Sequence, residues 1–285
     1  MKLLTRGYWV AAMLVALLSL AAPANAFSIT PLDTEIDVLP GEGYSGTIQV
    51  SSGAGEVSGH IYISDWKRLP NGDRETNEPG ILPRSCGKWL VLSPTQFELS
   101  AKENLEIRYS FNVPADATGS YWTYVMVESQ PRPMPPQPGM KTGLMVSAKA
   151  RFAFRLVVNV SKGRNILGRI NRVEVVPAPG DGQRDGGGLQ AGFLFENTGN
   201  TFINARCYLE IRGFDGEVIN QSGIHEFYAF PESEWWVRLP IDSGIPPGEY
   251  LVLGVVDYGG ASRVAGETRF TVPELSSPET SGAGR

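Results

Sequence analysis

Histidine and cysteine, which often carry catalysis or bind metal ions, are sparse in this 285-residue chain. It has two histidines, His60 and His225, and two cysteines, Cys86 and Cys207. Neither histidine has a second histidine or a cysteine at ligand spacing, so the sequence predicts no zinc site. It contains no nucleophile elbow, HExxH motif or P-loop, and no GxGxxG sequence that leads into a helical pattern. We therefore expect no metal, no cofactor and no enzymatic activity.

Two other segments have compositions that ligand sites sometimes use. The glycine-rich stretch at 180–188 lacks the regular acidic spacing of a calcium loop and the lysine of a P-loop, so we interpret it as a surface loop. Asp65, Trp66 and Lys67 together would suit a sugar-binding platform. A tryptophan at a strand end more often packs on the core, and we expect that role here.

The N-terminus has the three parts of a secretory signal. Lys2 and Arg6 supply positive charge, an apolar run follows at 10–22, and small residues precede a cleavage site after Ala26. The run is shorter than the roughly 20 residues that cross a bilayer, which disfavours a transmembrane anchor. We expect residues 1–26 to be removed and the mature protein to be periplasmic or secreted.

The charge balance excludes one class of partner. Thirty acidic side chains outnumber 25 basic ones, and the formal net charge is −5. Binding to nucleic acid needs clustered lysine and arginine, so nucleic acid is not an expected partner. No segment after the signal is apolar for long enough to span a bilayer, so we expect no membrane insertion after cleavage.

Alternating apolar residues, separated by Pro, Gly, Asn and Asp, dominate the rest of the chain, and helical patterns are almost absent. They predict about seven short strands in 27–162 and a similar set in 163–273, which is typical of immunoglobulin-like (Ig-like) sandwiches. The segment 67–88 is interpreted as a long loop, and 274–285 as a disordered tail. We predict an all-β fold of two Ig-like antiparallel β-sandwich domains in tandem.

Each strand set carries a similar motif before its penultimate strand. In the first set it is a Gly-Ser-Tyr sequence that ends at Tyr121, and in the second a Pro-Gly-Glu-Tyr sequence that ends at Tyr250. This predicts a tyrosine corner in each domain, in which the hydroxyl bonds back to the preceding turn.

The two cysteines fall in different predicted domains. Ig-like sandwiches usually form disulfides within one sandwich. We therefore expect Cys86 and Cys207 to be separate buried thiols, and a disulfide that joins the two domains is the alternative.

The longest alternation runs from 144 to 160 and contains nine apolar positions. It predicts either one long strand with one dry face or two strands in line across a bend. A proline-rich stretch at 131–138 precedes it.

The first domain resembles the N-terminal domain of periplasmic pilus chaperones, the PapD-like family of immunoglobulin folds. The resemblance covers roughly 27–161 and rests on segments 93–99, 105–113, 114–121 and 144–160. In that family the closing strand is laid into an incomplete pilin domain and completes its sheet by β-strand addition. The resemblance implies a protein-subunit partner and the partner-binding residues Leu144, Val146, Ala148, Lys149, Ala150 and Arg151. An ordinary strand that fills its own core is the alternative.

Two positions depart from the family. Its members anchor the carboxyl end of the pilin with an arginine on the first strand and a lysine on the last. Glu35 and Ala153 occupy the matching positions here, and Lys149, Arg151 and Arg155 are the remaining nearby cations. The resemblance thus extends to the fold more fully than to the anchoring chemistry.

Three functional hypotheses follow. The first is an extracytoplasmic chaperone-like protein that holds a secreted or surface-assembled, fimbrial-type subunit by strand addition. The second is a structural or adhesive surface protein of two Ig-like modules, and the third is a secreted carbohydrate-binding or hydrolytic protein. Strand donation requires part of 144–160 to lie on a sheet edge, with Leu144, Val146 and Ala148 projecting beyond the home core. Phe152, Phe154 and Leu156 are then expected to fill that core.

Overall fold

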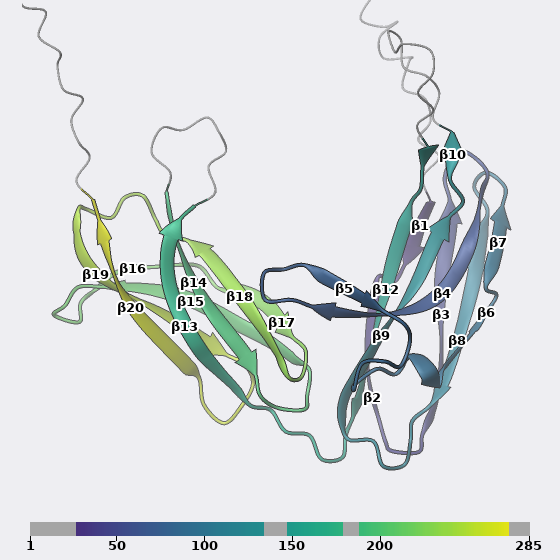
Figure 1. The fold of residues 1–285 in the computed structure, drawn as a ribbon, viewed down its shortest axis with the longest axis horizontal. Helices are drawn as coiled ribbons and strands as arrows, with labels where there is room; N and C mark the ends of the chain where they lie inside the picture. Colours follow the sequence, from purple (N-terminus) through teal and green to yellow (C-terminus); the bar gives the residue numbers. More distant parts are fainter. Residues whose placement is uncertain (1–26, 134–146, 179–187, 274–285) are drawn as a thin grey trace, which may run out of the picture.

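The computed structural model describes residues 27–133, 147–178 and 188–273. They form two β-sandwich domains joined by the segment 161–167 (Figure 1). The predicted all-β fold of two Ig-like sandwiches is therefore confirmed. The expected signal peptide and C-terminal tail, and the residues Leu144 and Val146, lie outside the described residues.

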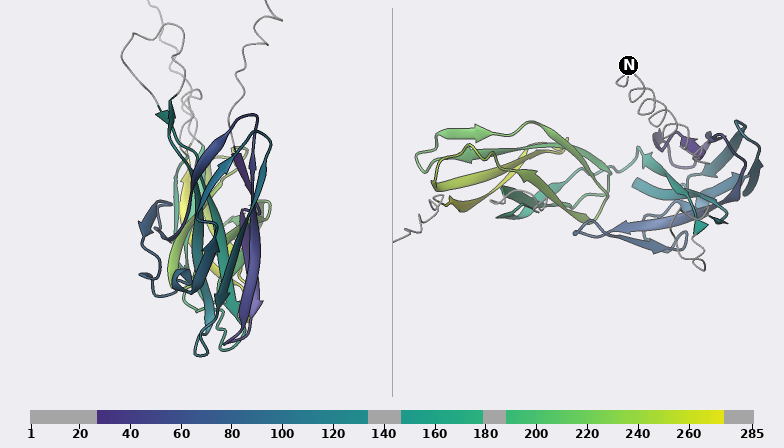
Figure 2. Two further views of the ribbon diagram at one scale, coloured as in Figure 1. Left: turned by 90° about the vertical axis from the view of Figure 1, so that its right-hand side faces the viewer. Right: turned by 90° about the horizontal axis from the view of Figure 1, so that it is seen from above.

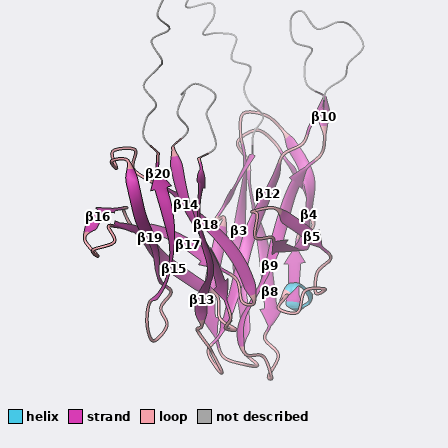
Figure 3. Cartoon of the chain, turned by 60° about the vertical axis from the view of Figure 1, so that its left-hand side comes forward, coloured by secondary structure: helices cyan, strands magenta, loops and turns pink. Residues whose placement is uncertain are grey.

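The described chain contains strands and one short 3₁₀ turn, η1 (Gly87–Trp89), which is the small helical element in Figure 3. None of its helical segments is long and apolar enough to cross a membrane. Seen from above, the two domains follow one another along the long axis (Figure 2, right).

The first domain has two main sheets. One has the strand order β1-β3-β8-β6, and the other has the order β2-β12-β9-β4-β5, with β7 paired to β4. A short β10-β11 ladder lies at one end. The strands are β1 (Phe27–Thr30), β2 (Asp33–Val38), β3 (Gly43–Ser52), β4 (Val57–Arg68), β5 (Arg74–Asn77), β6 (Leu90–Ser93), β7 (Gln96–Leu99), β8 (Asn104–Asn112), β9 (Gly119–Ser129), β10 (Arg132–Pro133), β11 (Ser147–Ala148) and β12 (Arg151–Val160).

The second domain also has two sheets. One has the order β13-β14-β18, and the other has the order β16-β15-β19-β20, with β17 paired to β15. The strands are β13 (Gly168–Pro177), β14 (Leu189–Asn197), β15 (Ile203–Arg212), β16 (Val218–Gln221), β17 (His225–Ala229), β18 (Ser233–Pro240), β19 (Gly248–Asp257) and β20 (Val264–Val272).

The alternation in the sequence becomes the inward face of each strand. In β8 the buried side chains are every second residue, Ile107, Tyr109 and Phe111, because successive side chains of a strand point to opposite faces. The second core is built around Phe193 on β14, which lies against β19. Gly254 permits this approach, since a Cβ there would lie 2.8 Å from Cδ1 of Phe193.

The segment 67–88 differs from its prediction as a long loop. β4 continues to Arg68, turns at Gly72 (φ 96°) and pairs with β5 in a hairpin. The tip of this hairpin approaches Trp235 of the second domain. The prediction was wrong because β5 is a short edge strand whose side chains face solvent, so it carries no apolar alternation.

Asp65 has a structural role. Its carboxylate is fully buried and accepts hydrogen bonds from the Gly80 N–H (2.7 Å) and the Thr123 hydroxyl (2.8 Å), which tie the returning chain to β9. Trp66 stacks on Tyr124 with ring centroids 4.7 Å apart. A sugar platform at these residues would lack the Asp65 carboxylate, since that group is already hydrogen-bonded inside the protein.

The two predicted tyrosine corners differ. The Tyr250 hydroxyl donates to the Pro246 carbonyl (2.9 Å), which is the geometry of a tyrosine corner. Tyr121 has no such bond to its preceding turn, all of whose residues are described. Its ring packs against Trp89, with centroids 4.6 Å apart, and the Arg84 guanidinium lies 5.8 Å from its centroid. The expectation for Tyr121 is corrected accordingly.

We predict that neither cysteine reacts in the native protein. Cys86 and Cys207 are free, fully buried and in different cores. Burial raises the pKa of Cys207 to about 11, and burial and the nearby Asp65 raise the pKa of Cys86, so both stay as unreactive thiols at neutral pH. Mass spectrometry after treatment with iodoacetamide is expected to show no alkylation of folded protein and double alkylation after unfolding without reductant. An unfolded species that resists alkylation would reveal a disulfide instead.

Candidate partner-binding edge and domain junction

Strand β12 is paired along its whole length on one side and along only part of it on the other. All of Arg151–Val160 opposes β9, whereas β2 pairs only with residues Arg155–Val160. The first four residues, 151–154, thus have no described strand on that side, and we call them the open edge. β12 runs from the β10-β11 end of the domain to the linker (Figure 1).

Backbone groups of the open edge point outward. Arg155 donates its N–H to the chain just before β2 (2.9 Å), while Ser129 on the β9 side donates to the Ala150 carbonyl (2.9 Å). Alternate residues of an extended strand point their N–H and C=O groups the same way. Arg151 and Ala153 therefore direct these groups to the same side of β12 as Arg155 does. Beside residues 151–154, that side has no described strand.

The apolar side chains of β12 fill the first domain. Phe154 and Leu156 are fully buried in its core, and Phe152 is half-buried with its ring 4.8 Å from that of Phe27. β12 is therefore a core strand along its inner face even where its edge is open.

The other predicted site residues that the structure describes lie in β11, at the start of β12 and in the segment between them. Ala148, Lys149, Ala150 and Arg151 are exposed, and the chain is interrupted between β11 and β12 rather than forming one strand from 144 to 160. The alternative of two strands in line across a bend is thus the one that the described part of this segment fits.

A buried carboxylate binds the two cations nearest the open edge. Glu128 on β9 is 3% exposed and accepts from both Lys149 and Arg151. The Tyr62 hydroxyl donates to it (3.1 Å), and Nε2 of His60 lies 3.4 Å away. Lys149 and Arg151 therefore hold the start of β12 against β9, and their charge is partly neutralised within the protein.

The bonds to Glu128 also set its protonation. Burial alone would raise the pKa of Glu128, but hydrogen bonds from Lys149, Arg151 and Tyr62 together outweigh burial, and the pKa lies below its ordinary value. A lowered folded-state pKa contributes stability above the unfolded-state pKa, roughly 4.3, and that contribution is lost as the pH falls through the folded-state pKa.

We predict that Glu128→Gln lowers the free energy of unfolding by roughly 1–3 kcal/mol at pH 7, because the charged hydrogen bonds are weakened. The difference from the wild type is expected to shrink as the pH falls below about 4, where the wild-type carboxylate is protonated too. Urea denaturation at several pH values measures this. Glu106→Gln, at an exposed carboxylate bound to Arg108, is the matched control and is expected to change little. A constant deficit at every pH would contradict the assignment.

Glu35, the acid at the family's arginine position, joins the two domains. Its Oε1 accepts from the Asn159 amide (2.6 Å) and its Oε2 from the Asn204 amide of the second domain (3.1 Å). Ala153, at the family's lysine position, packs against the aromatic cluster of the junction. The two matching positions thus hold a hydrogen-bonded bridge and a small apolar contact.

An aromatic cluster fills the junction between the domains. Its rings include Trp122 and Phe230 (centroids 4.5 Å apart) and Phe202 and Phe230 (5.3 Å). The cluster combines buried residues of both domains, namely Trp122, Tyr124, Met126, Val157, Phe202 and Phe230. The alternating strands alone do not predict this interface. A signal for it is the run at 121–127, which is apolar except for Thr123, because such a run is typical of a strand covered on both faces.

Two arginines pack on aromatic rings at the same junction. The Arg155 guanidinium lies 4.4 Å from the centroid of Tyr228 and 3.4 Å from the Asp33 carboxylate. The Arg68 guanidinium lies 3.4 Å from the centroid of Trp235 and 5.1 Å from that of Tyr228. Within the described part of the chain the Nε atoms of both arginines are buried without a hydrogen-bond partner. The domain orientation is therefore held by rings as well as by hydrogen bonds.

Ser120 is the central polar contact of the junction. Its backbone N–H donates to the Asn200 carbonyl (2.7 Å), and its hydroxyl accepts from the Phe202 N–H (2.7 Å) and donates to Asn159. Ser120 and Asn159 are both buried. These bonds are satisfied only when the two domains keep this orientation.

We predict that Ser120→Ala loosens the domain junction without unfolding either sandwich. The Phe202 N–H would lose its buried acceptor, at a cost of roughly 1–3 kcal/mol. Hydrogen exchange of this amide is expected to accelerate by about 5- to 150-fold, the equivalent of that cost. Ser110→Ala, on the exposed face of β8, is the control and is expected to leave the exchange rate unchanged. Unchanged protection of Phe202 in Ser120→Ala would show that this bond does not hold the junction.

Comparison with known proteins gives distant structural similarities only. No family model and no curated protein matches the sequence. The class 5 fimbriae chaperone CfaA has a TM-score of 0.44 and 14% identity, over 88% of this chain and 100% of that chain. The CsuC–CsuE chaperone–tip adhesion subunit pre-assembly complex, from archaic chaperone-usher Csu pili of Acinetobacter baumannii, has 0.42 and 13%, over 85% and 97%. The E. coli chaperone DraB has 0.38 and 14%, over 87% and 96%. Similarities at this level do not assign a function.

Proposed function

We propose that this protein is a non-enzymatic, extracytoplasmic chaperone-like protein that holds a secreted or surface-assembled, fimbrial-type subunit by β-strand addition. The observation that carries the proposal is the open edge of β12, whose outward backbone groups at Arg151 and Ala153 have no described partner strand. The sequence resemblance of 27–161 to periplasmic pilus chaperones supports the same role.

The sheet itself specifies where a partner strand would lie. β2 runs beside the second half of β12, in parallel and in register from Arg155 to Val160. A partner strand beside residues 151–154 would continue the line of β2 and extend the same sheet. Its backbone bonds would supply affinity, while its side chains would meet the half-buried Phe152 on one face and Ala153 on the other.

The open edge is also held ready for pairing. Phe152 and Phe154 anchor it to the core, and the salt bridges from Lys149 and Arg151 to Glu128 fix the approach to it. A strand that is already extended loses less conformational entropy on binding than a flexible loop does. The same core packing that forms the domain thus favours strand addition at its edge.

We predict that Ala153→Pro abolishes subunit binding with little loss of thermal stability. Proline removes the outward N–H of residue 153 but no ladder bond to β9, and proline is tolerated on open edges. Ala153→Gly keeps the N–H and is expected to retain binding. The measurement is co-purification of the tagged full-length chain with its subunit from the cell envelope, followed by hydrogen exchange of the complex. Binding is expected to protect the amides of Arg151 and Ala153. Retention of the subunit by Ala153→Pro, or unprotected edge amides in the complex, would contradict strand addition here.

A further inference from the structure

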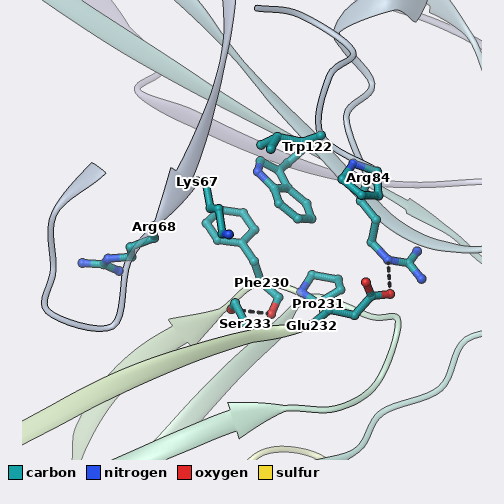
Figure 4. A pocket seen from close by; sticks show the side chains of 10 residues that line it. Lys67, Arg68, Arg84, Trp122, Phe230, Pro231, Glu232 and Ser233 are labelled. Carbon is teal, nitrogen blue, oxygen red and sulfur yellow. Dashed lines mark hydrogen bonds and ion pairs between the residues drawn. The ribbon is translucent and has the colours of Figure 1, made fainter. Parts of the chain in front are cut away.

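A cavity of about 210 Å³ lies at the domain junction (Figure 4), and no residue of the open edge of β12 lines it. The first domain lines it with the end of β4, the loop 82–84 and Trp122, and the second domain lines it with the β17–β18 turn, 230–233. It is therefore complete only when both domains are in place.

The floor of this cavity is aromatic. Trp122 and Phe230 lie with ring centroids 4.5 Å apart and are 8% and 4% exposed, so they are fixed by the packing of the junction. Leu82, Pro83 and Pro231 add apolar walls. A flat apolar group that enters here would be enclosed by rings and prolines on several sides.

The rim of the cavity is cationic. Lys67 is exposed and has no carboxylate within salt-bridge distance among the described residues. The Arg68 guanidinium is not available there, since it lies 3.4 Å from the centroid of Trp235 with its Nε buried. Arg84 is committed, since it donates to the Glu232 carboxylate (3.1 Å) and the Thr118 carbonyl (3.2 Å). Among the residues that line the cavity, Lys67 is therefore the cation free to meet an acid, although the protein as a whole is acidic.

The turn from the second domain is rigidly held. Glu232 has φ 57°, a left-handed conformation that a residue with a side chain rarely adopts. The Ser233 hydroxyl donates to the Phe230 carbonyl (2.7 Å), and Arg84 of the first domain holds the Glu232 side chain, as the dashed lines in Figure 4 show. The cavity is thus preformed rather than a gap between two loosely placed domains.

We propose that this cavity is a docking site for one aromatic side chain of an acidic peptide segment. Its volume lies below the roughly 300–1,000 Å³ of sites for drug-sized ligands, and it suits a single aromatic side chain. A carboxylate next to that side chain would meet Lys67 at the rim. A buried aromatic anchor surrounded by complementary charge is the usual core of a protein–protein contact. This site is separate from the open edge, and its occupation does not require strand addition.

Three capped synthetic peptides test the ligand class: Glu-Asp-Phe-Asp-Glu, Glu-Asp-Ser-Asp-Glu and Lys-Lys-Phe-Lys-Lys. The indole N–H resonance of Trp122 in the full-length protein reports occupation, because this residue forms the floor. We expect the acidic phenylalanine peptide to shift that resonance and to bind at least about ten-fold more tightly than the other two. Equal binding of the serine peptide, or no shift of the Trp122 resonance with the acidic phenylalanine peptide at millimolar concentration, would overturn the proposal.

Two charge-reversal variants test the location. Lys67→Glu is expected to weaken the acidic phenylalanine peptide about ten-fold, and the exposed side chain makes misfolding no concern. Lys88→Glu makes the same change on an exposed lysine that does not line the cavity, and is expected to leave the affinity nearly unchanged. Equal weakening by both variants would mean general charge attraction and would overturn the proposed site. The amides of Arg151 and Ala153 on the open edge are expected to keep their hydrogen-exchange rates when the acidic phenylalanine peptide binds, so failure of one proposal is distinguishable from failure of the other.

Discussion

Strand β12 must pack side chains on both of its faces and hydrogen-bond its backbone along both of its edges. The arrangement of the molecule depends on how these four contacts are made. Its inner face carries Phe154, Leu156 and Val158 into the first core. Its outer face presents Val157 and Ala153 to the second domain. One edge is hydrogen-bonded to β9 throughout, while the other is hydrogen-bonded to β2 only in the half nearest the linker. That half is enclosed on every side, and the remaining half keeps one open edge because β2 ends its pairing at Arg155.

The domain junction follows from the same strand and its neighbour. β9 and β12 send apolar side chains to both faces, so the outer face of their sheet needs a cover, and the second domain supplies it with Phe202 and Phe230. Apolar contact alone would allow sliding, since it has little directionality. The buried bonds at Ser120 and the bridge at Glu35 are directional and are satisfied in one orientation. The cavity beside Trp122 exists because this orientation is fixed.

Much of the fold could be predicted from the sequence, because a strand with one dry face shows its alternation directly. The predicted strand 105–113 is β8 shifted by one residue, and the core roles of Phe154 and Leu156 match their burial. β5 could not be predicted, since both of its faces are largely polar. The apolar run in β9, broken at Thr123, is typical of a strand with a covered outer face, but it does not show what covers that face, because the cover depends on the pairing of distant segments.

The candidate site was less predictable than the fold, for a physical reason that Lys149 and Arg151 illustrate. Both are polar positions in an alternating strand, and the sequence alone leaves them free for a partner. The register of β12 on β9 brings Arg151 opposite Glu128, which then binds both cations. Whether a charged side chain is free for a partner depends on which residue lies opposite it on the neighbouring strand. That residue is fixed by the strand register, which the length of the connecting loop does not reveal.

The charges near the open edge also protect it from pairing with a second copy of the protein. A bare edge normally pairs with its own copy, and proteins prevent this with charged side chains. Here one buried acid, Glu128, faces two cations that are each about half-exposed, so the edge retains positive charge. Two copies brought edge to edge would place like charges close together, which disfavours the pair. A neutral or acidic strand meets no such repulsion, and the residues that pin the edge in place therefore also discriminate against self-association.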